Sequence, residues 1–337
     1  MIEIDGRKGG GQMLRTSLTL STVTGKNFEM ENIRGSRSSP GLKHQHLECV
    51  KAAGRLCDAK IEGDEKGSEK IVFKPGNIRN ESFTSNIGTA GSITLLFDTV
   101  LPVTTQFSDS FRFTAKGGTD VKWSPTFNYF KHVKLPLLNQ NDCKADVELD
   151  ETGYYPKGGG EAVLTTDEFS LSSLGLKQRG ELERFEIYSK SSKDLEAQGV
   201  ADRQADEAAK LLKDEHMSVD IDKKVVYEET GSTGSSLLVK AVYEDSLAGF
   251  DAVGEKGKRS EDVAREVVND FEEFHSSEAA VDPYMADQLM VFLALVGGEV
   301  SIPEITDHVQ TNLEVIREFG FDLVLEERDG VNVLKKA

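Results

Sequence analysis

The stretch DGRKGGGQMLR, residues 5–15, joins a strand to a helix through a run of glycines, and this arrangement indicates the fold class. Residues 1–4 are predicted to form a strand, and residues 12–24 a helix that stops at Gly25. Glycine turns recur beside other expected strands, at residues 117–118 and 158–160. The self-similarity is weak, but it favours an α+β fold made of repeated α/β units.

The remaining elements alternate in a similar way. Helices are predicted at residues 40–59, 92–101, 125–138, 203–212, 261–274, 284–296 and 308–319. Strands are predicted at residues 70–73, 111–115, 145–149, 162–165, 182–188, 224–227, 237–243, 299–302, 323–326 and 331–334. Residues 169–179 are rich in Ser, Leu and Gly and are predicted to be a linker. We therefore expect a large domain, residues 1–179 plus 277–337, with an inserted smaller α/β domain at 180–276.

Length and composition exclude several classes of protein. The 337 residues are 38% hydrophobic, which is typical of a globular chain and is long for a single core. We find no long uncharged apolar run and no signal peptide, so the expected location is cytoplasmic, with no membrane partner. The three cysteines, Cys49, Cys57 and Cys143, are odd in number and form no Cys-x-x-Cys pair. Buried free thiols are therefore expected, in place of disulfides or a zinc site.

The overall charge is strongly negative, with a net charge of −18 and a pI of about 4.9. Either the partner is not a polyanion, or an acidic surface surrounds a local basic site. An acidic surface suits a high-salt cytoplasm and therefore favours a halophile. Residues 32–60 carry six lysines and arginines but only two acidic residues. This local excess indicates that positive potential is concentrated in one place.

Two segments have the composition of phosphate-binding loops. The glycines before the helix at residues 12–24 can present backbone N–H groups to a phosphate, with Arg15 one turn into the helix. The segment lacks the Gly-Lys-Ser/Thr ending of a Walker A loop, and a turn that only packs is the alternative. In RGSRSSPGLKHQH, residues 34–46, Arg34 and Arg37 can make forked contacts to phosphate oxygens. A solvated basic loop is the alternative there.

A third segment suits a nucleoside. In DPYMADQ, residues 282–288, Tyr284, Asp287 and Gln288 share one face of a helix by their spacing. The aromatic ring could stack on a base, and the carboxylate could accept from ribose hydroxyls. An ordinary helix start with polar residues is the alternative interpretation.

A fourth segment places a histidine at a helix start. Asp307 is predicted to be the N-cap, with Gln310 three residues on as in a capping box. His308 would then lie at the positive end of a helix, which lowers the pKa of an imidazole and keeps it neutral and nucleophilic. The same position favours an incoming phosphate. A surface histidine without a function is the alternative.

Together these segments resemble the RNA 3′-terminal phosphate cyclase family, of an archaeal type, over nearly the whole chain. The resemblance is strongest at residues 9–15, 34–46 and 88–102, and extends to 117–120, 155–160, 254–256, 284–288 and 308–312. The block at residues 180–276 matches least and corresponds to the family's inserted small domain. The number and order of the matching segments make a chance similarity very improbable.

The resemblance implies a covalent mechanism. His308 matches the family's nucleophile, which attacks the α-phosphate of ATP and releases pyrophosphate. The histidine–AMP adduct passes AMP to the 3′-phosphate of an RNA, and the vicinal 2′-hydroxyl then closes a 2′,3′-cyclic phosphate. A divalent cation, Mg²⁺ or Mn²⁺, is implied as a partner of the triphosphate.

The resemblance also implies roles for individual residues. Positions matching the nucleotide site are Gln12, Arg15, Asp98, Pro125, Tyr129, Tyr284, Met285, Ala286, Asp287 and Gln288. Positions matching contacts to phosphates of ATP or RNA are Arg15, Arg34, Arg37, Gln45 and His46. The family's opening usually reads Asp-Gly-x-x-Gly-Glu-Gly-Gly-Gly-Gln, whereas this chain lacks two of those residues and the acidic one associated with metal. Asp98 replaces a usual glutamine, and our hypothesis is that it supplies the lost metal-binding charge.

Two other functions remain as alternatives. Some relatives of the family are non-catalytic cyclase-like factors that act in ribosomal RNA processing and lack the histidine. A sugar-nucleotide or phosphate-binding enzyme with similar α/β units is the second alternative. The presence of His308 favours the cyclase over both. The sequence leaves open which RNA is modified and the oligomeric state, with a homodimer as one option.

Overall fold

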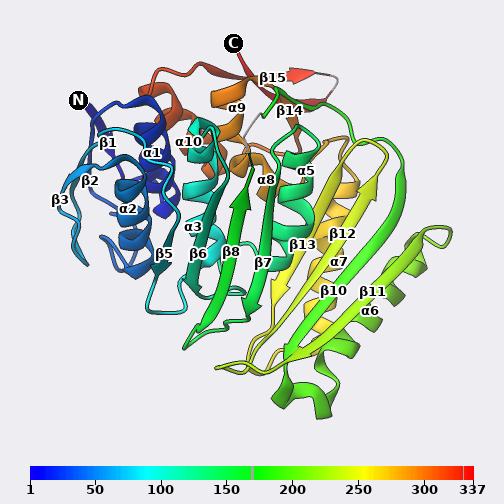
Figure 1. The fold of residues 1–337 in the computed structure, drawn as a ribbon. Coiled ribbons are helices and arrows are strands. Elements are labelled where there is room, and N and C mark those ends of the chain that lie inside the picture. The colour runs from blue at the N-terminus through cyan, green and yellow to red at the C-terminus, as the bar shows by residue number, and fades with distance from the viewer. Residues whose placement is uncertain (168–170, 329) are drawn as a thin grey trace.

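The computed structural model describes residues 1–167, 171–328 and 330–337, and in these residues one structural unit occurs three times (Figure 1). Each unit is a strand, a helix, a second strand, a second helical segment and two further strands. The first unit consists of β1 (Ile2–Asp5), α1 (Gly11–Thr24), β2 (Phe28–Glu31), α2 (His44–Cys57), β3 (Lys60–Glu62) and β4 (Ile71–Lys74). β1 pairs parallel with β2, and β4 and then β3 continue the sheet in antiparallel pairing.

The second unit repeats this order. It consists of β5 (Phe83–Asn86), α3 (Ile93–Val100), η1 (Leu101–Gln106), β6 (Phe111–Gly117), the helical segments α4 (Phe127–Tyr129), η2 (Phe130–Lys134) and α5 (Leu135–Asn139), β7 (Ala145–Glu151) and β8 (Gly160–Thr166). Its sheet has the order β5-β6-β8-β7, with the first pair parallel. The prediction of repeated α/β units is confirmed.

The third unit is interrupted by an insertion. It consists of β9 (Leu174–Leu176), α8 (Pro283–Gln288), α9 (Met290–Val296), β14 (Gly298–Ile302), α10 (Asp307–Glu318), β15 (Leu323–Arg328) and β16 (Val331–Lys336). Its sheet order is β9-β14-β16-β15, again with the first pair parallel. One hydrophobic core joins all three units through residues such as Leu14, Phe97 and Leu313.

The insertion lies between β9 and α8. It consists of β10 (Leu182–Ser192), η3 (Lys193–Gln198), α6 (Val200–Glu215), β11 (Asp220–Glu228), β12 (Ser235–Tyr243), β13 (Leu247–Val253) and α7 (Ser260–His275), and its sheet has the order β11-β10-β12-β13. It has its own hydrophobic core around Phe185, Val239 and Phe271. At its base, Arg179 donates to the carbonyl oxygens of His275 and Ala279, so the entering and leaving segments lie together. The separate core supports the domain boundaries proposed above, which stay a prediction.

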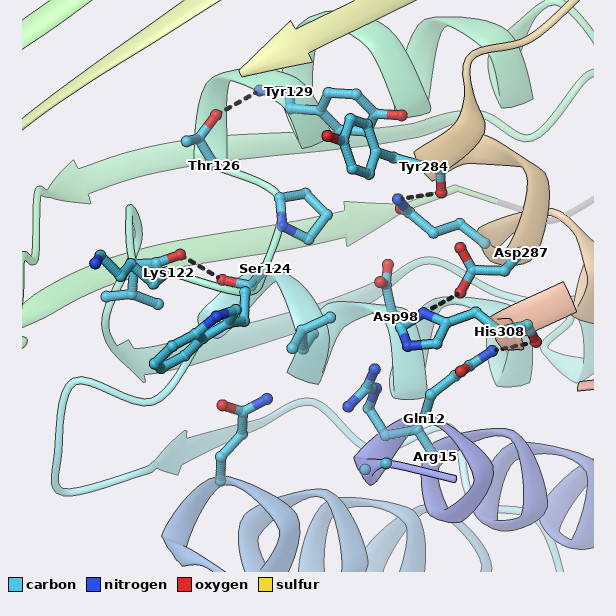
Figure 2. Close-up of a pocket in the computed structure, with 18 of the residues that line it drawn as sticks. Gln12, Arg15, Asp98, Lys122, Ser124, Thr126, Tyr129, Tyr284, Asp287 and His308 are labelled. Atoms are coloured by element: carbon cyan, nitrogen blue, oxygen red, sulfur yellow. Dashed lines mark hydrogen bonds and ion pairs between the residues drawn. The ribbon is translucent and has the colours of Figure 1, made fainter. Parts of the chain in front are cut away.

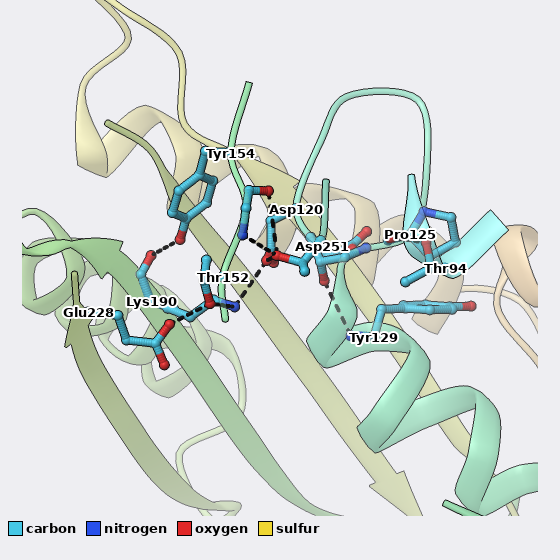
Figure 3. A network of polar contacts seen from close by, with 12 residues as sticks. Thr94, Asp120, Pro125, Tyr129, Thr152, Tyr154, Lys190, Glu228 and Asp251 are labelled. Carbon is cyan, nitrogen blue, oxygen red and sulfur yellow. Dashed lines mark hydrogen bonds and ion pairs between the residues drawn. The ribbon is translucent and has the colours of Figure 1, made fainter. Parts of the chain in front are cut away.

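Buried charges attach the insertion to the second unit (Figure 3). Lys190 of β10 donates to Asp120 Oδ2 at 2.9 Å and to Thr152 Oγ1 at 3.1 Å. The side chains of Lys190 and Asp120 are 5% and 0% exposed, so this pair is made within the protein interior. The hydroxyl of Thr152 in turn donates to Glu228 of β11. Removing one partner of such a pair would leave a buried charge unmatched and would destabilise the docking of the insertion.

The observed helices differ from the predicted ones at some ends and in some interiors. Gly25 ends α1 as expected, with a left-handed φ of 69° and its N–H donating to Ser21 O. The helix predicted from residue 40 begins only at His44, because Gly41 has a φ of 74° and its N–H bonds to Ile33 O instead. The helix predicted at 125–138 contains a π-helical turn, η2. The helix predicted at 284–296 is divided into α8 and α9.

Three further predictions can be compared with the structure. The predicted linker at 169–179 was wrong in part, because Leu174–Leu176 form β9, which pairs with β14; Phe169 and Ser170 lie outside the described residues. The strands β2, β3, β5 and β13 were not predicted. All three cysteines are buried and free, as predicted. Within the described parts of the chain, no helix has the length and apolar character needed to cross a bilayer.

Candidate functional site

A cavity of about 990 Å³ lies where the three units and β13 of the insertion meet. Its walls come from the starts of α1, α2 and α10, from α3, from the segment between β6 and α4, from α8 and from β13. Figure 2 shows Tyr129 and Tyr284 on one side of the cavity and Gln12 and Arg15 on the opposite side, with His308 and Asp287 between them. Segments far apart in the sequence therefore build one site.

The N-termini of α1 and α10 meet at this cavity. Gln12 Nε2 donates to the backbone oxygen of His308 at 3.0 Å, and one turn further Thr16 Oγ1 donates to Asn312 Oδ1 at 2.8 Å. The second contact lies four residues after the first in both helices, so α1 and α10 run side by side in the same direction. Their positive ends therefore point to the same place, which favours a bound anion such as phosphate.

His308 lies in the first turn of α10, with 56% of its side chain exposed. Its Nδ1 is 3.7 Å from Asp287 Oδ2, which is longer than a hydrogen bond but close enough for a charge interaction. With Nδ1 facing this carboxylate, the other ring nitrogen, Nε2, is left for a ligand. The carboxylate of Asp287 thus orients the imidazole as well as affecting its charge.

Two predictions about this helix start need correction. The N-cap of α10 is Thr306, whose side chain accepts from Val309 N, whereas Asp307 is the first helical residue. The pKa of His308 is raised, not lowered, because the neighbouring Asp287 carboxylate favours the imidazolium more than burial and the nearby arginines oppose it. The helix terminus alone does not decide the charge, since an opposite charge within about 4 Å is a stronger influence.

The predicted nucleoside side of the cavity is formed by α8 and the segment before α4. Tyr284, Asp287, Gln288, Pro125 and Tyr129 all line it. Asp282, fully buried at the start of α8, accepts from the hydroxyl of Tyr129 at 2.8 Å and from the backbone N–H groups of Tyr284 and Met285. The buried side chains of Met285 and Ala286 face the core, and neither residue lines the cavity.

The predicted phosphate side is formed by α1, by the loop before α2 and by the start of α2. Arg15, Arg34, Arg37, Gln45 and His46 all line the cavity. Gly10 and Gly11 make room for them, since a Cβ on Gly11 would lie 2.1 Å from His46 Nε2 and 3.3 Å from Arg15 Nη1. The glycine run at this helix start therefore lets the polar side chains lie directly over the helix terminus.

Three of these five side chains also have structural contacts. Arg34 Nη1 donates to the backbone oxygens of Ser39 and Gly41, so it holds the loop in shape. Gln45 Oε1 accepts from Ser92 N at 3.0 Å. His46 Nδ1 accepts from Lys43 N, and burial together with the charge of Arg15 lowers the pKa of His46 to about 3. His46 is therefore a neutral hydrogen-bonding group at physiological pH, and Arg15 and Arg37 provide charge.

Asp98 lines the cavity, but it also pairs with a lysine. Lys134 Nζ lies 2.5 Å from Asp98 Oδ1 and donates to Gln288 Oε1 at 3.1 Å. The Lys134 side chain is 1% exposed and that of Asp98 is 13% exposed. The charge of Asp98 is thus matched by a buried cation, which counts against its proposed role as a metal ligand.

The described residues do not build a protein site for a divalent cation. Across the described ranges there is no group of three or more His, Cys, Asp or Glu side chains placed to hold a metal ion. Mg²⁺ is usually bound through one or two carboxylates together with substrate phosphates and water, and Asp98, the carboxylate proposed for this role, is already paired with Lys134. We therefore expect a divalent cation to be bound chiefly by the triphosphate and water, with at most one carboxylate from the protein.

Sequence reasoning missed several residues of the cavity, including Lys134, Asp251 and Asn312. Lys134 had little signal in the sequence, because Lys131 and His132 lie just before it and it does not stand out among these basic residues. The π-helical turn that contains it is a feature often found at functional sites. Asp251 had no comparable signal, because its place beside Thr126 depends on how the insertion docks.

The fold and the site together define a class of α/β-repeat protein with a cavity that is lined by aromatic and charged side chains and bordered by a histidine. Comparison with known proteins makes this more specific. The family described as RNA 3′-terminal phosphate cyclase matches residues 6–322. The chain therefore belongs to the RNA 3′-terminal phosphate cyclase family, and the resemblance inferred from the sequence is confirmed.

Similar proteins from archaea have the same name. A protein of Halobacterium salinarum named RNA 3′-terminal phosphate cyclase is 38% identical over 345 residues, covering 99% of each chain. A protein of the same name from Saccharolobus solfataricus is 41% identical over 322 residues, covering 95% of this chain and 94% of that protein. A third, from Saccharolobus islandicus, has the same identity and coverage. The similarity therefore extends through the insertion as well as the three units.

Proposed function

We propose that this protein converts the 3′-phosphate of an RNA to a 2′,3′-cyclic phosphate, using ATP and a covalent histidine–AMP intermediate on His308. The observation that carries this proposal is the position of His308 between the two sides of one cavity. Aromatic and acidic side chains lie on one side of it, and arginines and a helix N-terminus on the other (Figure 2).

The cavity suggests how ATP would lie. The adenosine would lie against Tyr284 and Pro125, with the ribose near Asp287 and Gln288. The triphosphate would then extend across His308 towards Arg15 and Arg37, over the starts of α1 and α10. This orientation brings the innermost phosphate to the histidine and the outer phosphates to the positive end of α1, where anions are stabilised.

In the first step, the lone pair of His308 Nε2 would attack the α-phosphorus. The bond from that phosphorus to the bridging oxygen would break, and pyrophosphate would leave. Asp287 would stabilise the positive charge that develops on the imidazole, because its carboxylate faces Nδ1. The arginines would offset the negative charge on the departing pyrophosphate.

In the second step, an oxygen of the RNA 3′-phosphate would attack the phosphorus of the adduct. The phosphorus–nitrogen bond would break, and the imidazole would return to its starting state. In the third step, the vicinal 2′-hydroxyl would lose its proton and attack the activated phosphate, and AMP would leave. We expect any Mg²⁺ or Mn²⁺ to arrive with the triphosphate.

The alternative is a non-catalytic cyclase-like factor that binds RNA during processing. The support for an enzyme is that the histidine is present and fixed. Gln12 holds its backbone oxygen, and Asp287 faces its ring. The three relatives above all have the cyclase name. A cytoplasmic location, a halophilic source and a homodimer remain predictions.

The test is covalent labelling by ATP carrying radioactive phosphorus at the α position. We expect an acid-labile, alkali-stable label on the wild-type chain across a series of KCl and Mg²⁺ or Mn²⁺ concentrations, and none on His308→Ala. The matched control is His44→Ala, because His44 also lies in the first turn of a helix, α2, but does not line the cavity. Wild-type protein that stays unlabelled under all conditions while binding RNA would favour the non-catalytic factor.

A further inference from the structure

The chain has a single tryptophan, Trp123, and its side chain is almost fully exposed, at 95%. It lies in the segment between β6 and α4, and it lines the rim of the cavity that contains His308. Tryptophan is usually well buried, because its large ring gains much from leaving water. A single exposed tryptophan at the opening of the main cavity therefore suggests a ligand that covers it.

The backbone around Trp123 is firmly held. Ser124 Oγ donates to Val121 O at 2.9 Å, and Thr94 Oγ1 donates to Pro125 O at 2.8 Å. Thr126 N donates to Asp251 Oδ2 at 2.6 Å, and Lys122 forms an ion pair with Glu255 at 2.5 Å. Both sides of the tryptophan are thus anchored to other elements, including the insertion.

Trp123 itself has a left-handed φ of 63°, which is uncommon for a bulky residue. This conformation, fixed by anchors on both sides, directs the side chain out of the fold, where few protein atoms cover it. The ring is therefore presented in advance to a ligand, which reduces the entropy that binding would cost.

The charge of the protein favours a stacking ligand site. A net charge of −18 repels RNA at long range, so phosphate contacts alone give a weak basis for holding an RNA end. Stacking of an unpaired base on an aromatic ring adds binding energy without a further charge contact and does not require a particular base. An exposed indole beside the cavity has the required flat apolar face.

We propose that Trp123 is a stacking platform for an unpaired nucleobase at the 3′ end of the RNA substrate. This inference rests on the proposed function, since it assigns the second substrate to the same cavity. Figure 2 shows Lys122 and Ser124, the neighbours of Trp123, across the cavity from His308 and Asp287. The RNA end would enter over Trp123 with its 3′-phosphate towards His308, while ATP occupies the side of Tyr284.

Intrinsic fluorescence gives a direct test, because Trp123 is the only tryptophan in the chain. The wild-type protein without ATP is titrated with a short single-stranded RNA that ends in a 3′-phosphate. We expect saturable quenching of the emission, and much weaker quenching by the same RNA with abasic sites at its last two positions. RNA that binds, as measured by anisotropy, without changing the emission would overturn the proposal.

Kinetics of variants separate the two substrates. We expect Trp123→Leu to raise KM for the RNA about 5- to 150-fold, the factor corresponding to the ~1–3 kcal/mol of one base stack. Trp123→Phe, which keeps an aromatic face, should recover most of this loss. The control is Met217→Ala, since Met217 is 82% exposed and lies outside the cavity.

The histidine-labelling reaction distinguishes the outcomes. If Trp123→Leu labels with ATP as the wild type does but cyclises RNA with an unchanged KM, the stacking inference is wrong and the proposed function stands. If Trp123→Leu instead raises the KM for ATP, the ring contacts the nucleotide and the proposal is overturned. If the wild type is neither labelled nor able to cyclise RNA, the proposed function itself fails.

Discussion

The pair of Lys134 and Asp98 gives the most quantitative prediction. At 2.5 Å the two charges attract by roughly 6–7 kcal/mol at an effective dielectric constant near 20. Most of this only offsets the cost of removing the charges from water, so the pair itself adds little net stability. Removing one charge is different, because the other remains buried and unmatched, at a cost of about 3–5 kcal/mol. Since Asp98 borders the cavity, we expect a value near the lower end, ~3 kcal/mol.

The experiment is a double-mutant cycle in urea, with all proteins in the same concentrated KCl. We expect Lys134→Met and Asp98→Leu each to lower the free energy of unfolding by ~3 kcal/mol, a large part of the usual total of about 5–15 kcal/mol. The loss of unfolding free energy in the double variant should be smaller than the sum of the two single losses by at least ~2 kcal/mol, because no unmatched charge remains. Single losses below ~1 kcal/mol that simply add would refute the reasoning.

The same residues decide the metal hypothesis. If Asp98 held a catalytic cation, Asp98→Asn would raise the Mg²⁺ or Mn²⁺ concentration needed for half-maximal histidine labelling. We expect that concentration to stay unchanged, even if the labelling rate falls because Gln288 shifts with Lys134. A clear rise in the half-saturating metal concentration would show that Asp98 is a ligand and that the ion pair opens when ATP binds.

Three further predictions concern the nearby side chains. Asp287→Asn should lower the pKa of His308 and move the acid limb of the pH profile of labelling to lower pH, and an unmoved limb would contradict the role of Asp287. Gly11→Ala should raise the KM for ATP by about tenfold, since its Cβ would displace His46, whereas Gly175→Ala, with open space around its Cβ, should have no effect. Burial raises the pKa of Asp282 to about 6 from 3.8, so its contribution to stability is present below pH 4 and lost as the pH rises through 6. In urea denaturation from pH 4 to 7.5, we expect the free energy of unfolding of the wild type to fall by up to ~3 kcal/mol as the pH rises, and we expect Asp282→Asn to lack this fall. Equal slopes of the free energy of unfolding against pH for the two proteins would disprove the role of Asp282.

The sequence predicted the elements whose signals are local. Gly25 specified the end of α1, and the apolar stripe of residues 40–59 predicted α2, although the predicted helix began four residues before the observed one. It failed where pairing partners are distant in the chain. The three residues of β9 have no strand signal of their own and become a strand only beside β14. β5 is likewise completed by β6, which follows only after α3 and η1. Distance does not explain the missed β13, because its partner β12 directly precedes it in the chain.

The same distinction applies to the candidate site. Residues that occur in motifs, such as His308 and Arg15, were found and do line the cavity. The charge state of His308 was predicted with the wrong sign, because the sequence does not show that Asp287 faces its ring. Lys134 was missed because it acts through Asp98 and Gln288, and those contacts exist only when α3, η2 and α8 come together.

Strand β13 of the insertion holds both walls of the proposed nucleoside side. Gly249 N donates to Asp282 Oδ2, and Asp282 begins the helix that carries Tyr284 and Asp287. Two residues further, Asp251 accepts from Thr126 N, beside Pro125 on the other wall (Figure 3). Because a single rigid strand fixes both contacts, any shift of the insertion would move the two walls together. The insertion is therefore part of the construction of the cavity, in addition to its attachment through Lys190 and Asp120.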